Sequence, residues 1–322
     1  MKEVRKILLN NDRYLLAGHI QPDGDTVGSC MALGMALRQM GKQAIVKLDP
    51  FSSSLNIIPG RELLTDESYE HNSNTVCIAL DCASPERLGE TKKLFDKSDI
   101  TVCIDHHASN EGWAKFNYIE PNTSSTAEMV YRLIEPITEI GCDIATAIYA
   151  GMVMDTGGFR YNATAKSTME IAAKLMESGV PFTDVYSQLM HMHKFLDGKA
   201  LGTALYNSAL LEDGKIVYSF VEAEKLKKFG AKSQNLEGTV EYLMGTRGAL
   251  IAALVYERST VAEVKVSLRS KGPNVGNIAA KLGGGGHKLA AGATSYKSVD
   301  ETLKSTLEYA VQELKEWESS QG

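Results

Sequence analysis

Long apolar runs are missing from this sequence of 322 residues. No stretch approaches the roughly 18 consecutive apolar residues that a membrane-spanning helix requires. The first residues lead into only a short apolar stretch, so the core of a secretory signal peptide is missing as well. The sequence also contains no internal repeat and no low-complexity tract. These absences predict a globular protein of the cytoplasm that is not held at a membrane.

Cysteine is scarce, and the five cysteines include no Cys-x-x-Cys pair. Cys77, Cys82 and Cys103 lie in or beside apolar runs, which indicates reduced thiols in the core of a cytoplasmic protein. Basic residues are in the minority, since 34 Lys and Arg face 40 Asp and Glu for a net charge of −6. This charge disfavours a broad electrostatic grip on long duplex DNA or RNA, and it favours short anionic substrates bound by a local patch.

The order of hydrophobic patterns indicates two domains, and a chain of this length with 43% apolar residues can form two cores. Residues 1–190 alternate strand and helix patterns, so we expect an α/β domain with a mostly parallel sheet and flanking helices. Residues 191–207 are expected to form a helical connector. Residues 208–322 are expected to form a smaller α/β domain.

Local signals place several elements within this plan. A helix is predicted over 26–40, and Ser125 with Glu128 three residues later predicts a capping box at the start of another helix. Asp213 and Gly214 mark the turn of a hairpin. Further expected elements are helices over 168–178, 184–207 and 299–317, strands over 250–256 and 261–268, and a surface loop around His71.

Polar side chains gather where the short apolar runs of the first domain end. They are His19, Asp23, Asp25, Asp81, Asp105, His106, His107 and Asp155. Because parallel strands end at one edge of a sheet, we expect these side chains to lie together where open α/β sheets bind ligands. The five carboxylates among them would repel one another without cations. The pattern therefore predicts the two-metal pocket of a metal-dependent phosphoesterase.

The chain resembles the DHH family of phosphoesterases, whose four motifs match here in order. The matching segments are residues 18–25 after the run 14–17, Asp81 after 76–80, Asp105-His106-His107 after 100–104, and Asp155 after 145–154. Arg269, followed by the glycine run 283–286 and His287, is similar to the substrate-binding domain associated with this family. Within the family, the resemblance is to small bacterial oligoribonucleases that also act as phosphoadenosine-phosphate phosphatases.

The resemblance implies a role for each metal ligand. His19 and Asp23 bind one ion, and Asp81 bridges it to a second ion. The other ligands of the second ion are Asp25, His106 and Asp155. The family usually uses manganese, and mixed imidazole and carboxylate ligands suit Mn²⁺ better than Mg²⁺ or Ca²⁺, which prefer shells of oxygen. We therefore expect two Mn²⁺ ions, with Mg²⁺ or Co²⁺ as substitutes.

Two residues of the third motif are expected to serve catalysis. The leaving 3′ oxygen is expected to be protonated or neutralised by His107 or by metal coordination itself, and Asp105 orients a histidine through a hydrogen bond, a role that the resemblance implies. A third metal site at His191 and His193 is disfavoured because no carboxylates lie near them in the sequence. We expect a packing or solvated role for these two histidines.

Substrate recognition is expected in the second domain, which closes over the metals. Arg269 offers a bidentate fork for a terminal phosphate, and His287 donates to a phosphate or ribose oxygen. Glycines lack the Cβ atoms that would keep backbone amides away from a phosphate, and those expected to act here are Gly284, Gly285 and Gly286. Residues 241–292 carry seven Lys and Arg against three Glu, a local excess of +4. The partner that stacks on a base is left open among Phe159, Tyr161 and Tyr242.

These observations favour a manganese-dependent phosphoesterase that hydrolyses short oligoribonucleotides to mononucleotides and converts 3′-phosphoadenosine 5′-phosphate to AMP. The alternative is a phosphodiesterase of cyclic di-AMP or its linear dinucleotide product, and the third interpretation is a nucleotide-binding module that has lost catalysis. Family II pyrophosphatases carry a different C-terminal domain and RecJ-type exonucleases are much longer, so neither is favoured. Short RNA and small nucleotides are the expected partners, and a homodimer is left open.

Overall fold

The computed structural model describes residues 1–65, 74–258 and 263–321. They form two compact units, Met1–Met192 and His193–Gly322, which are described separately. His71 and the first two residues of the strand predicted over 261–268 lie outside the described residues. Within the described part of the chain, no helix combines the length and the apolar character needed to cross a membrane.

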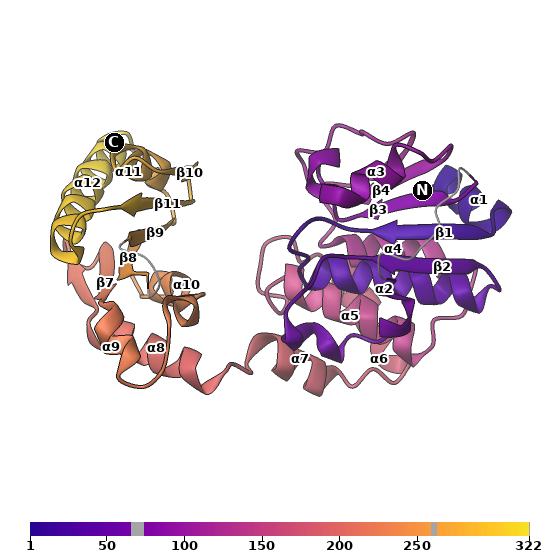
Figure 1. Cartoon of the computed structure of the whole chain (residues 1–322), viewed down its shortest axis with the longest axis horizontal. Coiled ribbons are helices and arrows are strands. Elements are labelled where there is room, and N and C mark those ends of the chain that lie inside the picture. Colours follow the sequence, from indigo (N-terminus) through magenta and orange to yellow (C-terminus); the bar gives the residue numbers. More distant parts are fainter. Residues whose placement is uncertain (66–73, 259–262, 322) are drawn as a thin grey trace. The chain divides into compact units, whose positions relative to one another are not determined.

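The first unit is built on a sheet of five parallel strands (Figure 1). They are β1 (Arg13–Ala17), β2 (Gln43–Lys47), β3 (Val76–Leu80), β4 (Thr101–Asp105) and β5 (Phe116–Ile119). Their spatial order is β2-β1-β3-β4-β5, and every neighbouring pair is parallel. The order reverses between β1 and β3, and the carboxyl ends of two such strands are where open α/β sheets bind ligands. The predicted α/β architecture with a parallel sheet is confirmed.

Both faces of this sheet are buried. Tyr14 and Leu16 of β1 join one large core, whereas Leu15 and Ala17 join a smaller core on the opposite face. The smaller core is closed by η3 (Pro85–Thr91) and α3 (Lys92–Phe95). Strands that are buried on both faces appear in a sequence as continuous apolar runs, and this is why the apolar runs mark these strands.

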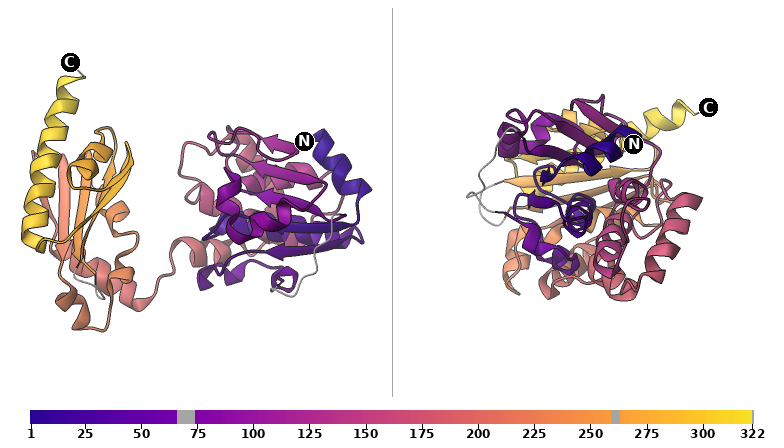
Figure 2. Two further views of the ribbon diagram at one scale, coloured as in Figure 1. Left: turned by 45° about the horizontal axis from the view of Figure 1, so that its top comes forward. Right: turned by 90° about the vertical axis from the view of Figure 1, so that its right-hand side faces the viewer.

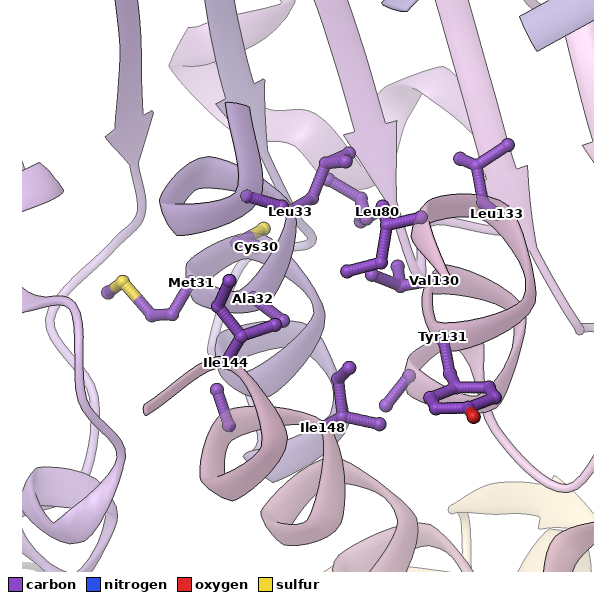
Figure 3. Packing of buried hydrophobic residues seen from close by; sticks show 14 of the residues in the cluster. Cys30, Met31, Ala32, Leu33, Leu80, Val130, Tyr131, Leu133, Ile144 and Ile148 are labelled. Atoms are coloured by element: carbon purple, nitrogen blue, oxygen red, sulfur yellow. The ribbon is translucent and has the colours of Figure 1, made fainter. Parts of the chain in front are cut away.

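Helices α2 (Gly24–Gln39), α4 (Thr126–Ile134) and α5 (Cys142–Asp155) fill the large core. Figure 3 shows Leu33 of α2, Val130 of α4 and Ile148 of α5 packed together with Leu80 of β3. The remaining helices of the unit are α1 (Lys2–Asn10), α6 (Lys166–Glu177) and α7 (Phe182–Met190). Helix α2 is buried on nearly all sides, so its place in the unit is fixed by packing rather than by an amphipathic face.

Two glycines allow α2 and α5 to approach each other closely. A Cβ atom at Gly28 of α2 would lie 2.5 Å from the carbonyl oxygen of Ala147, and one at Gly151 of α5 would lie 2.9 Å from Asp25 Oδ1. Atoms packed at normal density do not approach so closely, so only glycine fits at these positions. The close approach brings Asp25, in the first turn of α2, near Asp155 at the end of α5.

The second unit contains a six-stranded mixed sheet in the order β10-β11-β9-β8-β7-β6. Its strands are β6 (Ala209–Leu211), β7 (Ile216–Val221), β8 (Ile251–Glu257), β9 (Val264–Ser270), β10 (Gly285–His287) and β11 (Ala290–Ser295). Helices α11 (Val275–Lys281) and α12 (Val299–Ser319) cover one face, and Figure 2 shows α12 running along it. On the other face, α8 (Phe195–Tyr206), α9 (Ala223–Lys227) and α10 (Thr239–Met244) pack over β7 and β8. The smaller α/β domain is thus confirmed.

Two local predictions need correction. Ser125 does cap α4, since its hydroxyl accepts a hydrogen bond from Glu128 N at 3.1 Å. The Glu128 side chain does not complete a capping box; it is buried and accepts hydrogen bonds from Ser124, Thr168 and Arg132. The stretch 184–207 is not one helix, because α7 ends at Met190 and α8 begins at Phe195. The two helices pack into different cores, α7 against α5 and α8 against β7, so neither extends through 191–194.

The contact between α2 and α5 predicts that Gly28→Ala destabilises the protein. The added methyl group must push the helices apart, at a cost of about 1–3 kcal/mol. Thermal unfolding would measure the change. Gly202→Ala is the matched control: Gly202 lies in α8 with no atom within 4 Å of its built Cβ, so alanine should be neutral or stabilising there. Equal unfolding temperatures for the two variants would contradict this account of Gly28.

Candidate metal centre

The loop after β1 supplies the first two metal-ligand candidates. Asp23 is the N-cap of α2, and its Oδ1 accepts hydrogen bonds from the backbone amides of Asp25 and Thr26, both at 3.1 Å. Its other oxygen, Oδ2, lies 3.7 Å from His19 Nε2. His19 donates from Nδ1 to the carbonyl oxygen of Ile20 at 2.7 Å, because a carbonyl oxygen can only accept. Nε2 is therefore the nitrogen of His19 that faces Asp23 and Asp81, the position from which it can bind a metal.

His106 is oriented in the same way at the end of β4. Its Nδ1 donates to the carbonyl oxygen of Thr123 at 3.2 Å, so Nε2 is the nitrogen that faces the neighbouring carboxylates. Nε2 lies 3.1 Å from Asp155 Oδ2 and 3.7 Å from Asp81 Oδ1. Two histidines thus direct their Nε2 atoms toward carboxylates, an arrangement that divalent metal sites use.

Asp25 is deeply buried, with 1% of its surface exposed. Its Oδ2 accepts a hydrogen bond from Thr126 N at 2.7 Å, and its Oδ1 accepts one from Ala127 N at 2.8 Å. These amides begin α4, where the helix dipole favours negative charge. Burial, and then the charges of Asp81 and Asp155, nevertheless raise the pKa of Asp25 well above its ordinary value.

Burial, and then the charges of neighbouring acids, raise the pKa values of Asp25, Asp81 and Asp155, and this bears on whether cations fit here. Burial is the largest cause that raises the pKa of Asp155, to about 6, and the charges of Asp81 and Asp23 add to it. Three donor groups have their ligand atoms within 4.8 Å of one another: His19 with Asp23 and Asp81, Asp25 with His106 and Asp155, and Asp81 with His106 and His107. Mixed imidazole and carboxylate donors around buried acids fit divalent cations, because a cation removes the repulsion.

His107 and Asp105 form a separate hydrogen-bonded pair. His107 Nδ1 donates to Asp105 Oδ1 at 2.8 Å, and the hydrogen bond is the largest cause that raises the pKa of His107 to about 9. Asp105 is fully buried, and its Oδ2 accepts from Asn110 Nδ2 at 2.7 Å. The sequence analysis missed Asn110, because a single asparagine three residues after the motif is only a weak signal.

The second unit places Arg269 and His287 in one row of its sheet. Arg269 on β9 and His287 on β10 are both in register with Ala290 of β11, so their side chains lie on the same face. Arg269 Nη2 already has a partner, Glu241 Oε1, at 2.6 Å. His287 is exposed. The Arg269 guanidinium, which was predicted to bind a phosphate, therefore forms an ion pair with Glu241 in this structure.

The glycine run is shaped by β11. A Cβ atom at Gly284 would lie 2.2 Å from the carbonyl oxygen of Gly292, and one at Gly286 would lie 2.5 Å from Ala291 Cα. Gly285 has no atom within 4 Å of its built Cβ. Close strand packing thus explains two of the three glycines predicted to approach a phosphate, and only Gly285 faces open space.

Beside this run lies a cavity of about 350 Å³ that sequence reasoning did not identify. Its lining includes Lys265 and Ser267 of β9, Gly283 and Thr294. Lys265 Nζ lies 2.5 Å from Thr294 Oγ1. The sequence around Lys265 does not indicate that this lysine lines a cavity, because the cavity depends on which strands pair.

The remaining sequence candidates are not drawn into the centre. The metal-ligand groups found among the described residues include neither His191 nor His193. Phe159 is partly buried, and its ring centroid lies 6.0 Å from that of Tyr149, so it is a packing residue. Tyr161 and Tyr242 are 57% and 61% exposed. Either ring has a surface free for stacking.

Comparison with known proteins agrees with these features. The model of the DHH family N-terminal domain matches residues 13–152, and the model of the DHHA1 domain matches residues 213–319. A relative named bifunctional oligoribonuclease and PAP phosphatase NrnA, from Thermus thermophilus, is 32% identical over 93% of this chain and 89% of its own. The chain belongs to the DHH family. Its members are metal-dependent phosphoesterases, so the predicted class of enzyme is confirmed.

Two further comparisons bear on fold and activity. The crystal structure of an exopolyphosphatase-related protein from Bacteroides fragilis superposes with a TM-score of 0.83 at 27% identity, covering 97% of this chain and 95% of that one. The cyclic-di-AMP phosphodiesterase GdpP of Geobacillus thermodenitrificans is 25% identical over 90% of this chain. The chain spans only 46% of that relative.

The His107–Asp105 pair predicts that Asp105→Asn lowers the pKa of His107 from about 9 toward the ordinary histidine value, because a neutral amide no longer stabilises the imidazolium. NMR titration of metal-free protein would measure it. Asp143→Asn, on the surface at the start of α5, is the control and should leave the titration unchanged. A His107 pKa that stays near 9 in Asp105→Asn would show that Asp105 does not hold the proton.

Proposed function

We propose that this chain is a manganese-dependent phosphoesterase that hydrolyses short oligoribonucleotides to mononucleotides and converts 3′-phosphoadenosine 5′-phosphate to AMP. The observation that carries the proposal is Asp81, whose Oδ2 lies 3.7 Å from His19 Nε2 and whose Oδ1 lies 3.7 Å from His106 Nε2, so that one carboxylate faces both sets of proposed ligands. A carboxylate shared in this way suits a pair of cations. The NrnA relative supports the substrate class, since it is named for both activities over nearly the whole length of the chain.

The proposed ligands divide between two ions. His19 and Asp23 would hold one, Asp81 would bridge, and the second would take Asp25, His106 and Asp155. Two divalent cations bound about 3.5–4 Å apart would stabilise charge on the phosphoryl oxygens and lower the pKa of an attacking water. Manganese is the proposed metal because imidazole ligands suit it better than they suit magnesium.

His107 is the proposed general acid. With its pKa raised to about 9, it is protonated at neutral pH and can give that proton to the leaving 3′ oxygen as the phosphorus–oxygen bond breaks. Asp105 is buried and holds the ring through Nδ1, so the other nitrogen, Nε2, is the one that can donate. Asn110 restrains Asp105 in turn.

Arg269, His287 and the backbone at Gly284–Gly286 are proposed to bind a second phosphate of the substrate. Both proposed substrates carry such a phosphate, which a guanidinium binds through two parallel hydrogen bonds. The ion pair between Arg269 and Glu241 means that the phosphate must compete with a carboxylate. We also propose a cytoplasmic location, because all five cysteines are free and disulfides are rare in that compartment.

One substrate panel tests the proposed function. It holds 3′-phosphoadenosine 5′-phosphate, RNAs of two to five residues, a long RNA, cyclic di-AMP and pyrophosphate, each with Mn²⁺ and with chelator. We expect Mn²⁺-dependent turnover of the first two that fades with RNA length. His106→Ala, which removes a proposed ligand, should lower every rate more than about 100-fold. Faster turnover of cyclic di-AMP would replace the proposal with the cyclic-dinucleotide alternative, and no turnover would leave a binding module.

The Arg269–Glu241 pair allows a sharper test of substrate binding. Arg269→Ala should raise KM for phosphoadenosine phosphate about 10- to 100-fold, the value of a charge-assisted hydrogen bond, while Mn²⁺ binding persists. Glu241→Gln should keep or lower KM, because it frees the guanidinium. If the pair were merely structural, both variants would lose stability alike and neither would change KM.

A further inference from the structure

Asp81 is held by two threonines that no sequence motif singled out. It follows β3 with a left-handed backbone at φ 56°, which a non-glycine residue seldom adopts, and only 2% of its surface is exposed. Thr26 Oγ1 donates to Asp81 Oδ2 at 2.7 Å, and Thr126 Oγ1 donates to Asp81 Oδ1 at 3.3 Å. Both threonines are fully buried. Each carboxylate oxygen therefore receives one hydroxyl group.

The two oxygens face different sets of donors. Asp81 Oδ2 lies 3.7 Å from His19 Nε2, whereas Oδ1 lies 3.7 Å from His106 Nε2 and 3.7 Å from His107 Nδ1. A carboxylate oxygen has two lone-pair positions, so a hydroxyl on one leaves the other for a cation. With both oxygens fixed, the carboxylate cannot turn to offer both of them to one side.

Each threonine also touches a second acid through its backbone amide. Thr26, in the first turn of α2, donates from N to Asp23 Oδ1 at 3.1 Å. Thr126, the first residue of α4, donates from N to Asp25 Oδ2 at 2.7 Å. Thr26 thus links Asp81 to the acid of the first donor group, and Thr126 links it to an acid of the second. The two threonines are equivalent parts of the two halves of the centre.

We propose that Thr26 and Thr126 are positioning residues, each of which sets the affinity of one cation site by holding one oxygen of Asp81. The proposal rests on the two-cation centre of the proposed function. Without its hydroxyl, Asp81 is free to rotate toward the other donor group. Loss of either threonine should therefore weaken one site selectively, and Thr26 should matter more because its hydrogen bond is the shorter.

Mn²⁺ binding to metal-free protein provides the test, because it does not depend on turnover. Calorimetry gives the affinity of each site, and electron paramagnetic resonance reports whether two Mn²⁺ ions are exchange-coupled. Thr26→Val and Thr126→Val keep the side-chain shape and remove the hydroxyl. We expect about a 10- to 100-fold loss of affinity at one site, the usual effect of removing a group that orients a ligand. Thr26→Ser and Thr126→Ser should restore it.

Double variants assign each threonine to its site. Thr26→Val should add nothing to His19→Ala, which removes a ligand of the first group, and should add its full effect to Asp155→Ala. Thr126→Val should show the reverse. Thr146→Val, at a buried threonine of α5, is the matched control and should leave both affinities unchanged. If a valine variant does not fold, the alanine variant replaces it in the same measurement.

Three results would overturn the proposal: wild-type affinity at both sites in both valine variants, equal losses at both sites, or serine variants that behave as valine variants do. The proposed function can be disproved independently of this positioning role. If wild-type protein binds two Mn²⁺ ions with these selective effects and yet hydrolyses nothing in the substrate panel, the positioning role stands and the phosphoesterase does not.

Discussion

The metal centre of the first unit depends on acids that are buried together and repel one another. Asp25, Asp81 and Asp155 converge where they have little water to screen them, and burial is the main cause that raises the pKa of each. A fold that only had to be stable would avoid such a cluster. Here the first amides of α4 and two threonine hydroxyls partly offset the repulsion. The remainder is the driving force for binding cations.

Sheet topology and helix packing supply the geometry that this cluster needs. The strand order reverses between β1 and β3, so the loops that carry His19 and Asp81 diverge and leave room between them. Gly28 and Gly151 let helices α2 and α5 approach each other so closely that Asp25 and Asp155 belong to one donor group. A parallel sheet alone would bring together the strand-end residues only. The glycine contact adds the acids of the helices.

How far the sequence predicts this site depends on the range of each interaction. Strand ends were predictable because a strand buried on both faces leaves a continuous apolar run, and the polar residue after Leu80 or Ile104 is then conspicuous. The roles of Thr26 and Thr126 were not predictable, because threonine is common in the first turn of a helix and Asp81, the partner of both, is distant in sequence. Gly284 and Gly286 were predicted to approach a phosphate, whereas the structure explains them by their close contact with β11. The sequence could not show this contact, because it depends on which strands pair. The break at 191–194 was missed because it reflects two separate cores rather than a local breaker.

Three histidines at one centre illustrate how a hydrogen bond to one ring nitrogen selects the role of the other. His19 and His106 donate hydrogen bonds from Nδ1 to backbone carbonyl oxygens, which carry no charge and leave Nε2 facing the carboxylates. His107 donates a hydrogen bond from Nδ1 to the buried carboxylate of Asp105, which favours the doubly protonated ring. A cationic imidazole has no lone pair for a metal, but it has a proton to donate. Adjacent residues of one motif, His106 and His107, can therefore be ligand and acid because their Nδ1 partners differ by one charge.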